Sequence, residues 1–279
     1  MSAAFRFGTV GSPISTPKKP GGSVGAILRL KELGLEALEL GWVRAVRVTL
    51  ETCAAIQAAS LAQDVVISIH APYFINLNAS DEEWVNSRKR LMDAAIYGNL
   101  AGATDIIFHP GSYFNQPPTQ VLGVAIERLQ GCLEELRTAD NQVTLRPETM
   151  GKPAMLGSLE DTLAMAKALP GVEPCLDFAH LHARPGNGSI NTYDEFAHIL
   201  DQYAAALGEG SLKHLHIHLS GIRYGEKGER EHLLLKDSDL NLIDLFKALK
   251  HFHCQGRILC ESPVMEDDAL YMKALWEEK

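Results

Sequence analysis

Histidines and carboxylates stand at the ends of successive apolar runs, where they could bind metal ions. His70 ends VVISIH, and His109 ends DIIFH. Imidazole nitrogens and carboxylate oxygens without a thiolate favour zinc, manganese or iron as the bound ion. The ligands that we expect for a two-metal core are, in chain order, His70, His109, Glu148, Asp177, His218 and Glu261.

A two-metal core of this kind would suit phosphate ester hydrolysis. A carboxylate can be shared by two ions because it offers two oxygens, and Glu148, Asp177 and Glu261 all qualify. Ions about 3.5–4 Å apart activate a water and stabilise both oxygens of an in-line phosphoryl displacement. Taken singly, each residue would more often be structural, as when Glu148 pairs with Arg146. Taken together, they would leave several unpaired polar groups in one interior, which is costly without cations.

Short β-like runs that alternate with longer amphipathic runs would position these side chains. Eight such units in 279 residues predict a single-domain α/β protein over residues 1–279, a (β/α)8 TIM barrel with the metal site at the C-terminal mouth of its strands. A doubly wound open sheet is the alternative, but TVGSPIST is a poor match to its glycine-rich turn. The predicted strands are Arg6–Val10, Ala37–Leu40, Val65–His70, Asp105–His109, Gln142–Pro147, Glu173–Asp177, Lys213–Leu219 and Arg257–Glu261.

The predicted helices fill the intervals between these strands and follow the last one. Cap-type residues at Thr49, Ser80, Ser158 and Thr192 support four of the helix starts. The predicted helices are Val24–Leu33, Leu50–Leu61, Glu82–Ala101, Gln120–Leu136, Leu159–Leu169, Thr192–Leu207, Asn241–Phe252 and Asp267–Glu277.

Side-chain alternation within the strands places the expected ligands on the inner face. In Lys213–Leu219, the leucines and the isoleucine would face the helices, while His214, His216 and His218 would face the lumen. We interpret His214 and His216 as polar core residues or as supports for the ligands. The segment Gly221–Asp239 is long and charged, and we expect it to be a lid or a ligand-bearing loop.

The composition argues against a membrane protein, a secreted protein and a protein with broad affinity for nucleic acid. No stretch is apolar enough to span a bilayer, and the start of the chain lacks the layout of a signal peptide. The five cysteines are scattered without a C-x-x-C, which is typical of free thiols in a reducing cytoplasm, and we expect a cytoplasmic monomer. The net charge of −9 argues mildly against broad affinity for nucleic acid, but a local basic rim and bound cations can reverse the sign at one face.

Six motifs occur together in the order of one known family. SIHAPYFINL, IIFHPGS, PETMGK, CLDFAH, HIHLSG and ILCESP run from the third predicted strand to the last. With them the chain resembles the endonuclease IV family, the zinc-dependent apurinic/apyrimidinic endonucleases, within the xylose-isomerase-like barrels. The resemblance implies hydrolysis of the DNA phosphodiester 5′ to an abasic site, in base excision repair.

The resemblance also implies three zinc ions. His70 and His109 would bind the first ion, Glu148 would bridge the first and second, and Asp177, His218 and Glu261 would complete the second. His180 would belong to a third ion, together with an aspartate and a histidine from the loop after the seventh strand.

That loop departs from the family pattern. GEREH stands where the family has D-x-H, so Glu229 and Glu231 occupy the expected positions and His232 lies one place further on. Either Glu229 with Glu231 or His232 binds a third ion, or the third site is weak or absent.

Several residues are candidates for contact with the substrate. Tyr73 matches a family tyrosine that packs at the damaged site, whereas Trp42 and Arg44 could clamp DNA or simply cover the barrel rim. His182, in DFAHLHAR, is either a substrate contact or support for a ligand, or else a surface residue.

Three functions remain open. The first is the abasic-site endonuclease, with Glu148 and Glu261 holding and polarising the cluster, and with damaged DNA as the partner. The second is a metal-dependent isomerase or epimerase of a sugar or sugar phosphate, which does not need the pair His70 and His109. The third is a non-catalytic, metal-stabilised binder of damaged DNA, for which the altered GEREH segment is the support.

Overall fold

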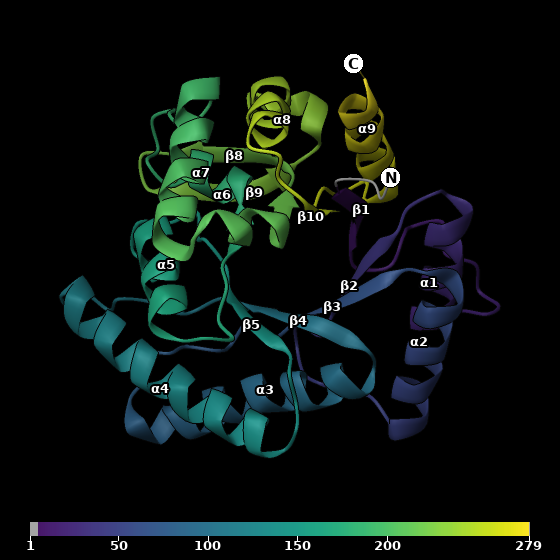
Figure 1. Cartoon of the computed structure of the whole chain (residues 1–279), viewed down its shortest axis with the longest axis horizontal. Helices are drawn as coiled ribbons and strands as arrows, with labels where there is room; N and C mark the ends of the chain where they lie inside the picture. Colours follow the sequence, from purple (N-terminus) through teal and green to yellow (C-terminus); the bar gives the residue numbers. More distant parts are fainter. Residues whose placement is uncertain (1–4, 279) are drawn as a thin grey trace.

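The computed structural model describes residues 5–278 of the chain. Eight parallel strands curl into a nearly closed barrel, in the order β5-β4-β3-β2-β1-β10-β7-β6, and the helices surround it (Figure 1). This confirms the predicted TIM barrel. The barrel strands are β1 (Phe5–Val10), β2 (Ala37–Gly41), β3 (Val66–His70), β4 (Ala103–Phe108), β5 (Thr144–Pro147), β6 (Cys175–Asp177), β7 (Leu215–Leu219) and β10 (Gly256–Cys260).

The helices follow the predicted ranges closely. Thr49, Ser80, Ser158 and Thr192 each accept a hydrogen bond from the main-chain N–H three residues on, as helix caps do. None of the helices within residues 5–278 is long and apolar enough to cross a membrane. The α-helices are α1 (Gly22–Glu32), α2 (Leu50–Gln63), α3 (Asp81–Leu100), α4 (Pro118–Thr138), α5 (Leu159–Ala168), α6 (Phe178–Ala183), α7 (Tyr193–Leu207), α8 (Leu242–His251) and α9 (Glu266–Glu277).

Two elements were not predicted, and both lie next to the expected ligands. The short helix α6 begins directly after β6, because the Asp177 carboxylate accepts a hydrogen bond from the N–H of His180. The predicted lid or ligand loop folds as an antiparallel hairpin of β8 (Gly221–Gly225) and β9 (Gly228–Leu233). Short 3-10 helices η1 (Glu209–Lys213) and η2 (Leu235–Asp237) flank β7 and this hairpin.

The barrel has a seam between β5 and β6. Only two isolated bridges cross it among the described residues, Leu145 to Val172 and Glu148 to Cys175. Pro147 ends β5, and Pro174 precedes β6. Because proline has no N–H to donate, a regular ladder cannot continue through either position.

The barrel lumen is polar, and an ion-pair cluster closes it at the N-terminal ends of the strands. Buried Asp105 pairs with Arg146 and, at 2.8 Å, with Arg257. Arg146 also binds Glu173 at 2.9 Å, so it is not the partner of Glu148 that the structural alternative required. The prediction for His214 is wrong, because this residue is exposed at the closed end and its carbonyl oxygen accepts a hydrogen bond from Arg146.

Candidate metal centre

The expected ligands meet at the C-terminal mouth of the barrel. Each lies at or just beyond the end of a strand, since parallel strands of a barrel direct their carboxyl ends to one face. The first group unites the ends of β3, β4 and β5. Nε2 of His70 and Nε2 of His109 each lie 3.3 Å from Oε2 of Glu148. One ion could therefore contact all three side chains.

The second group shares Glu148 and spans the seam. It contains Glu148, Asp177, His218 and Glu261, whose ligand atoms all lie within 4.8 Å of one another. Nδ1 of His218 lies 3.6 Å from Oε1 of Glu148 and 3.5 Å from Oε1 of Glu261. Glu148 thus offers Oε2 to the first group and Oε1 to the second, as a bridging carboxylate must.

A third group forms around His180. Its Nε2 atom lies 3.3 Å from Nε2 of His232 and 3.6 Å from Oε2 of Glu229. Asp177 lies close enough to join His180 and His232 in one ligand set. The expectation that Glu231 could serve in this group is wrong, because its exposed side chain pairs with Arg223 at 3.0 Å.

A β-bulge explains why His232, and not Glu231, faces the site. Opposite residues of an antiparallel pair point to the same side of the hairpin. Tyr224 pairs with Glu229 and Ile222 with His232, and the register shifts between these two pairs. The extra residue in β9 is Arg230. Because of it, Glu229 and His232 point to the same face although they are three places apart, whereas in a regular strand residues two places apart share a face.

Glycine at position 151 leaves space for this third group. A Cβ atom there would lie 2.6 Å from Cβ and 2.8 Å from Oε2 of Glu229. The main-chain oxygen of Gly151 also accepts a hydrogen bond of 2.8 Å from the N–H of Glu229. The close approach of these two backbones fixes the hairpin over the site.

Main-chain oxygens orient three of the imidazole rings. Nδ1 of His70 donates to the carbonyl of Ala71 at 3.0 Å, and Nδ1 of His180 donates to Thr149 at 2.9 Å. Nδ1 of His232 lies 3.3 Å from the carbonyl oxygen of Glu261. Nε2 of each ring is left to face the cluster, and in His180 the Nδ1 atom also lies 3.2 Å from Oε1 of Glu148.

The buried charges of the cluster shift one another's proton affinities. Burial alone would raise the pKa of Glu148, but His109, His180 and His218 hold it well below the ordinary range. Burial acts to lower the pKa of His70, yet its contact with Glu148 raises it to about 9. Burial and two neighbouring carboxylates raise the pKa of Asp177 to about 6. The buried carboxylates thus favour positive charge beside them, which divalent cations would supply.

Unsatisfied oxygens indicate that these residues fit metal ions. Both carboxylate oxygens of Glu148 and Oδ2 of Asp177 are buried and have no hydrogen-bond partner among residues 5–278. A buried carboxylate oxygen without a partner is costly, and cations remove that cost. A donor set of imidazoles and carboxylates suits zinc, manganese or iron.

A cavity of about 370 Å³ opens over the three groups. Tyr73, which is 51% exposed, lies in its wall, with its ring stacked against His109 at 5.2 Å between centroids. Lys152 adds a positive charge to the wall. Trp42 packs half-buried against the core, and Arg44 is exposed on the loop after β2, so their role in binding stays a prediction.

His182 does not have the surroundings expected of a substrate contact. The ring is fully buried, with Nδ1 2.7 Å from the carbonyl oxygen of Ser189 and Nε2 3.1 Å from Oδ1 of Asp239. Tyr224 donates a hydrogen bond of 2.6 Å to Oδ2 of the same carboxylate. His182 therefore ties the loop after α6 to the segment that follows the hairpin.

Sequence reasoning missed Glu39, which lies directly beneath the second group. It is fully buried on β2, and its Oε1 atom lies 3.1 Å from Nε2 of His218. A charged residue inside ALELG was the available signal, because an unpaired buried carboxylate is costly.

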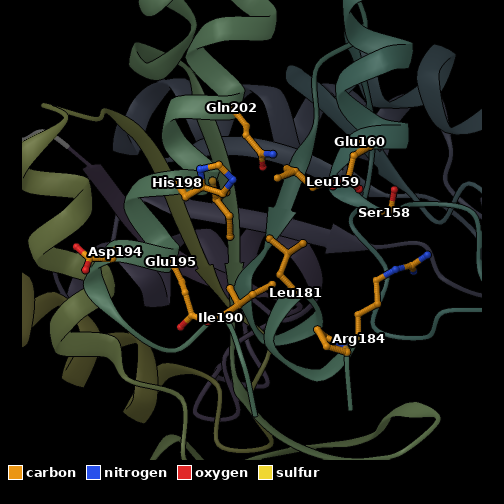
Figure 2. Close-up of a pocket in the computed structure, with 12 residues that line it drawn as sticks. Ser158, Leu159, Glu160, Leu181, Arg184, Ile190, Asp194, Glu195, His198 and Gln202 are labelled. Carbon is orange, nitrogen blue, oxygen red and sulfur yellow. The ribbon is translucent and has the colours of Figure 1, made fainter. Parts of the chain in front are cut away.

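A larger cavity, of about 480 Å³, lies outside the barrel against α5, α6 and α7. Figure 2 shows Leu159, Leu181 and Ile190 in its wall, with the guanidinium of Arg184 directed away from them. That guanidinium binds the carbonyl oxygens of Met150 and Lys152 at 3.0 and 2.7 Å. Arg184 thus holds the segment that walls the metal cavity.

The sequence is similar to one family of barrel proteins and to several individual proteins. The model of the family described as "Xylose isomerase-like TIM barrel" matches residues 27–277. An uncharacterized protein of Methanocaldococcus jannaschii is 38% identical over 98% of this chain and 97% of its own length. A probable endonuclease 4 of Staphylococcus saprophyticus is 28% identical over 59% of this chain, and the match spans 55% of that relative.

Solved structures share the whole barrel at lower identity. Endonuclease IV from Thermus thermophilus has a TM-score of 0.71 at 24% identity, and covers 98% of this chain and 100% of its own. A D-tagatose 3-epimerase-like protein has a TM-score of 0.72 at 17% identity, with 97% and 95% covered. These likenesses show the fold and do not choose between the two reactions.

Proposed function

The chain belongs to the xylose isomerase-like TIM barrel family, and we propose that it is a zinc-dependent endonuclease that cleaves DNA 5′ to abasic sites. The proposed partner is duplex DNA with a missing base, and the proposed state is a cytoplasmic monomer. One observation carries the proposal. Three ligand groups meet at one barrel mouth, and Glu148 and Asp177 each belong to two of them.

The pair His70 and His109 favours the nuclease over an isomerase. A group of three carboxylates and one imidazole, Glu148, Asp177, His218 and Glu261, would be enough to hold one ion for sugar chemistry. The first and third groups bring in His70, His109, His180 and His232 as further candidate ligands. Several neighbouring ions are suited to the charge that develops on a phosphoryl group.

Aromatic side chains beside the cluster suit an unstacked nucleic acid. Tyr73 and Phe74 are 51% and 66% exposed, and the guanidinium of Arg90 lies 6.0 Å from the centroid of the Phe74 ring. Both aromatic residues line a second hollow of about 380 Å³, which shares Tyr73 and Met155 with the metal cavity. Exposed aromatic and apolar side chains can wedge between base steps, and a missing base lowers the cost of turning a nucleotide outward.

In the proposed reaction, each residue of the site has a separate role. Glu148 and Glu261 would hold the ions, and His70 and His109 would complete the first group. Tyr73 would pack against the sugar of the lesion, while Lys152 attracts the phosphate backbone. Bound divalent ions would supply activation of water and stabilisation of the leaving oxygen. No nucleophilic side chain is needed.

An end-labelled duplex with one abasic analogue tests the proposal. The zinc-loaded protein is expected to nick the strand 5′ to the lesion and to leave an undamaged duplex intact. His109→Ala and Glu261→Gln should each lower the rate by more than about 100-fold, the upper range for residues that merely support a ligand. Glu231→Gln is the matched control, because this exposed carboxylate pairs with Arg223 outside the cluster.

Failure to nick would be informative if the ions are bound. A protein that holds two or three ions and leaves the abasic duplex intact is not this endonuclease. Sugar phosphates should then be assayed, because the group of Glu148, Asp177, His218 and Glu261 alone supports an isomerase or epimerase. Tight binding of abasic duplex without turnover of either substrate would instead support a non-catalytic binder of damage.

A further inference from the structure

We infer that Glu39 is the residue that positions His218 as a metal ligand, and that it does so from beneath the metal centre. The inference rests on the proposed metal centre but not on the substrate. Glu39, His216 and His218 are all fully buried in the lumen. Nε2 of His218 lies 3.1 Å from Oε1 of Glu39.

The two ring nitrogens of His218 face opposite directions. Nδ1 is directed at the cluster, 3.6 Å from Glu148 and 3.5 Å from Glu261. Nε2 is directed down the barrel at Glu39. The two atoms are close but do not form a hydrogen bond of regular geometry. The negative charge of the carboxylate favours the ring form with the proton on Nε2, which leaves the lone pair of Nδ1 for an ion.

His218 differs in this respect from three other rings of the cluster. His70, His180 and His232 are oriented through Nδ1 by main-chain oxygens, and each presents Nε2 to the cluster. His218 is reversed, and its anchor is a side chain. A main-chain anchor survives any substitution of the residue that carries it, whereas the anchor of His218 can be removed by one mutation.

Glu39 is itself held in place. Its Oε2 atom accepts a hydrogen bond of 2.8 Å from Ser68, its register partner on β3, and another of 2.9 Å from Nε2 of His216. These two donors occupy one oxygen and leave Oε1 for His218. The fixed carboxylate thus sets both the direction and the proton of the ring above it.

Three variants separate positioning from general packing. Glu39→Leu replaces the acceptor with an apolar side chain that still fills most of the space. Glu39→Gln keeps the volume and one acceptor oxygen, so it should weaken zinc binding by less than Glu39→Leu does. Thr162→Ala is the matched control, since it removes a buried hydroxyl of α5 that donates to the carbonyl oxygen of Leu159, away from the metal centre.

Zinc retention and histidine NMR are the readouts, and neither needs a substrate. Zinc-loaded full-length protein is dialysed against graded chelator, and the zinc per chain is counted. In Glu39→Leu one ion should be released at a roughly 10–100-fold lower chelator concentration, while the remaining ions should be retained as in the wild type. Thr162→Ala should retain every ion as the wild type does. In the metal-free protein, ¹⁵N-histidine spectra should show the Nε2–H signal of His218 lost or exchange-broadened in Glu39→Leu and kept in Thr162→Ala.

Two results would overturn the inference. One is wild-type zinc retention in Glu39→Leu. The other is an equal loss of affinity for every zinc ion in Glu39→Leu, which would mean that Glu39 supports only the fold. If Glu39→Leu does not fold, Glu39→Gln decides, and it must weaken one ion selectively. Because these readouts need no DNA, the inference can fail while abasic nicking is observed, and it can hold when nicking is absent.

Discussion

The absence of one side chain gives the third ligand group its space. Gly151 lies so close to Glu229 and His180 that any Cβ atom would contact both side chains. The glycine is thus a steric condition of the site, although it offers no ligand atom. Its position in PETMGK, between β5 and α5, would otherwise be taken for an ordinary loop glycine.

Gly151→Ala should therefore remove the third ion selectively. The added methyl group would lie 2.6 Å from Cβ of Glu229, so the hairpin must shift away from His180. Affinity for one zinc ion is expected to fall roughly 10–100-fold, as it does when a ligand loses its support. The measurement is zinc per chain after dialysis against a weak chelator, followed by the rate of abasic nicking.

Gly123→Ala is the control for that variant. Gly123 lies in α4, and a Cβ atom there would meet nothing within 4 Å. This substitution should leave the zinc count unchanged and stabilise the helix by at most about 1 kcal/mol. An unchanged zinc count in Gly151→Ala as well would contradict the steric role of the glycine.

Residue types and strand-end spacing were enough to select six side chains that lie together at the barrel mouth, because alternation along a strand is a local property. Glu39 escaped this reasoning because its importance depends on which side chain lies across the lumen. The same holds for His182, whose partners Ser189 and Asp239 come from other loops. Contacts between remote parts of a chain leave no periodic trace in the sequence.

At the scale of elements, the hairpin of β8 and β9 decides which residues of GEREH can bind an ion. The bulge at Arg230 turns Glu229 and His232 to one side and Glu231 to the other. The D-x-H spacing of the resembling family made Glu231 a candidate beside Glu229, with His232 as the alternative. Bulges depend on pairing between strands, and the printed sequence does not reveal where the pairing slips.

Two variants of the hairpin test the bulge. The double variant Glu231→His with His232→Ala would direct the imidazole at position 231 to solvent beside Arg223 and would leave no ligand at position 232. That double variant should lose the third ion. Deletion of Arg230 should keep it, because Glu229 and His232 would then be two places apart in a regular strand. Zinc counts that respond in the opposite way would contradict this account of β9.

At the scale of the molecule, the barrel has one end for chemistry and one end closed by ion pairs. Asp105, Arg146 and Arg257 come from β4, β5 and β10, and they close the lumen opposite the metal centre. The alternation of β-like and helical runs was sufficient to predict the barrel itself. It could not predict which charges pair at the closed end, because Arg146 could equally have turned toward Glu148.

Asp105→Asn should destabilise the fold in a pH-dependent way. Removing one member of a buried ion pair costs about 3–5 kcal/mol, since the arginines keep their charge. Burial raises the pKa of Asp105, but Arg146 and Arg257 hold it well below its ordinary value of 3.8. A depressed folded-state pKa stabilises at neutral pH, and this stabilisation is lost as pH falls below 3.8.

Urea unfolding of chelator-treated protein between pH 7 and pH 3 measures this effect. The gap between the wild type and Asp105→Asn should be widest near neutral pH and should narrow in acid. Asp93→Asn is the control, because the exposed pair of Asp93 with Lys89 should contribute less than about 1 kcal/mol. A gap that stays constant over the whole range would exclude the charge of Asp105 as its cause.

Because β5 and β6 are joined by few backbone contacts, an ion bound at the proposed metal centre would stabilise the barrel at this seam. The strands on either side meet through two bridges, and Glu148 and Asp177 stand at their ends on opposite sides of this gap. An ion held by both carboxylates would cross-link the C-terminal ends of β5 and β6. Amide hydrogen exchange should then be faster along β5 and β6 in the chelated protein than in the loaded one, and nearly equal in β1 and β2. An ion at this position would complete the circumference of the barrel.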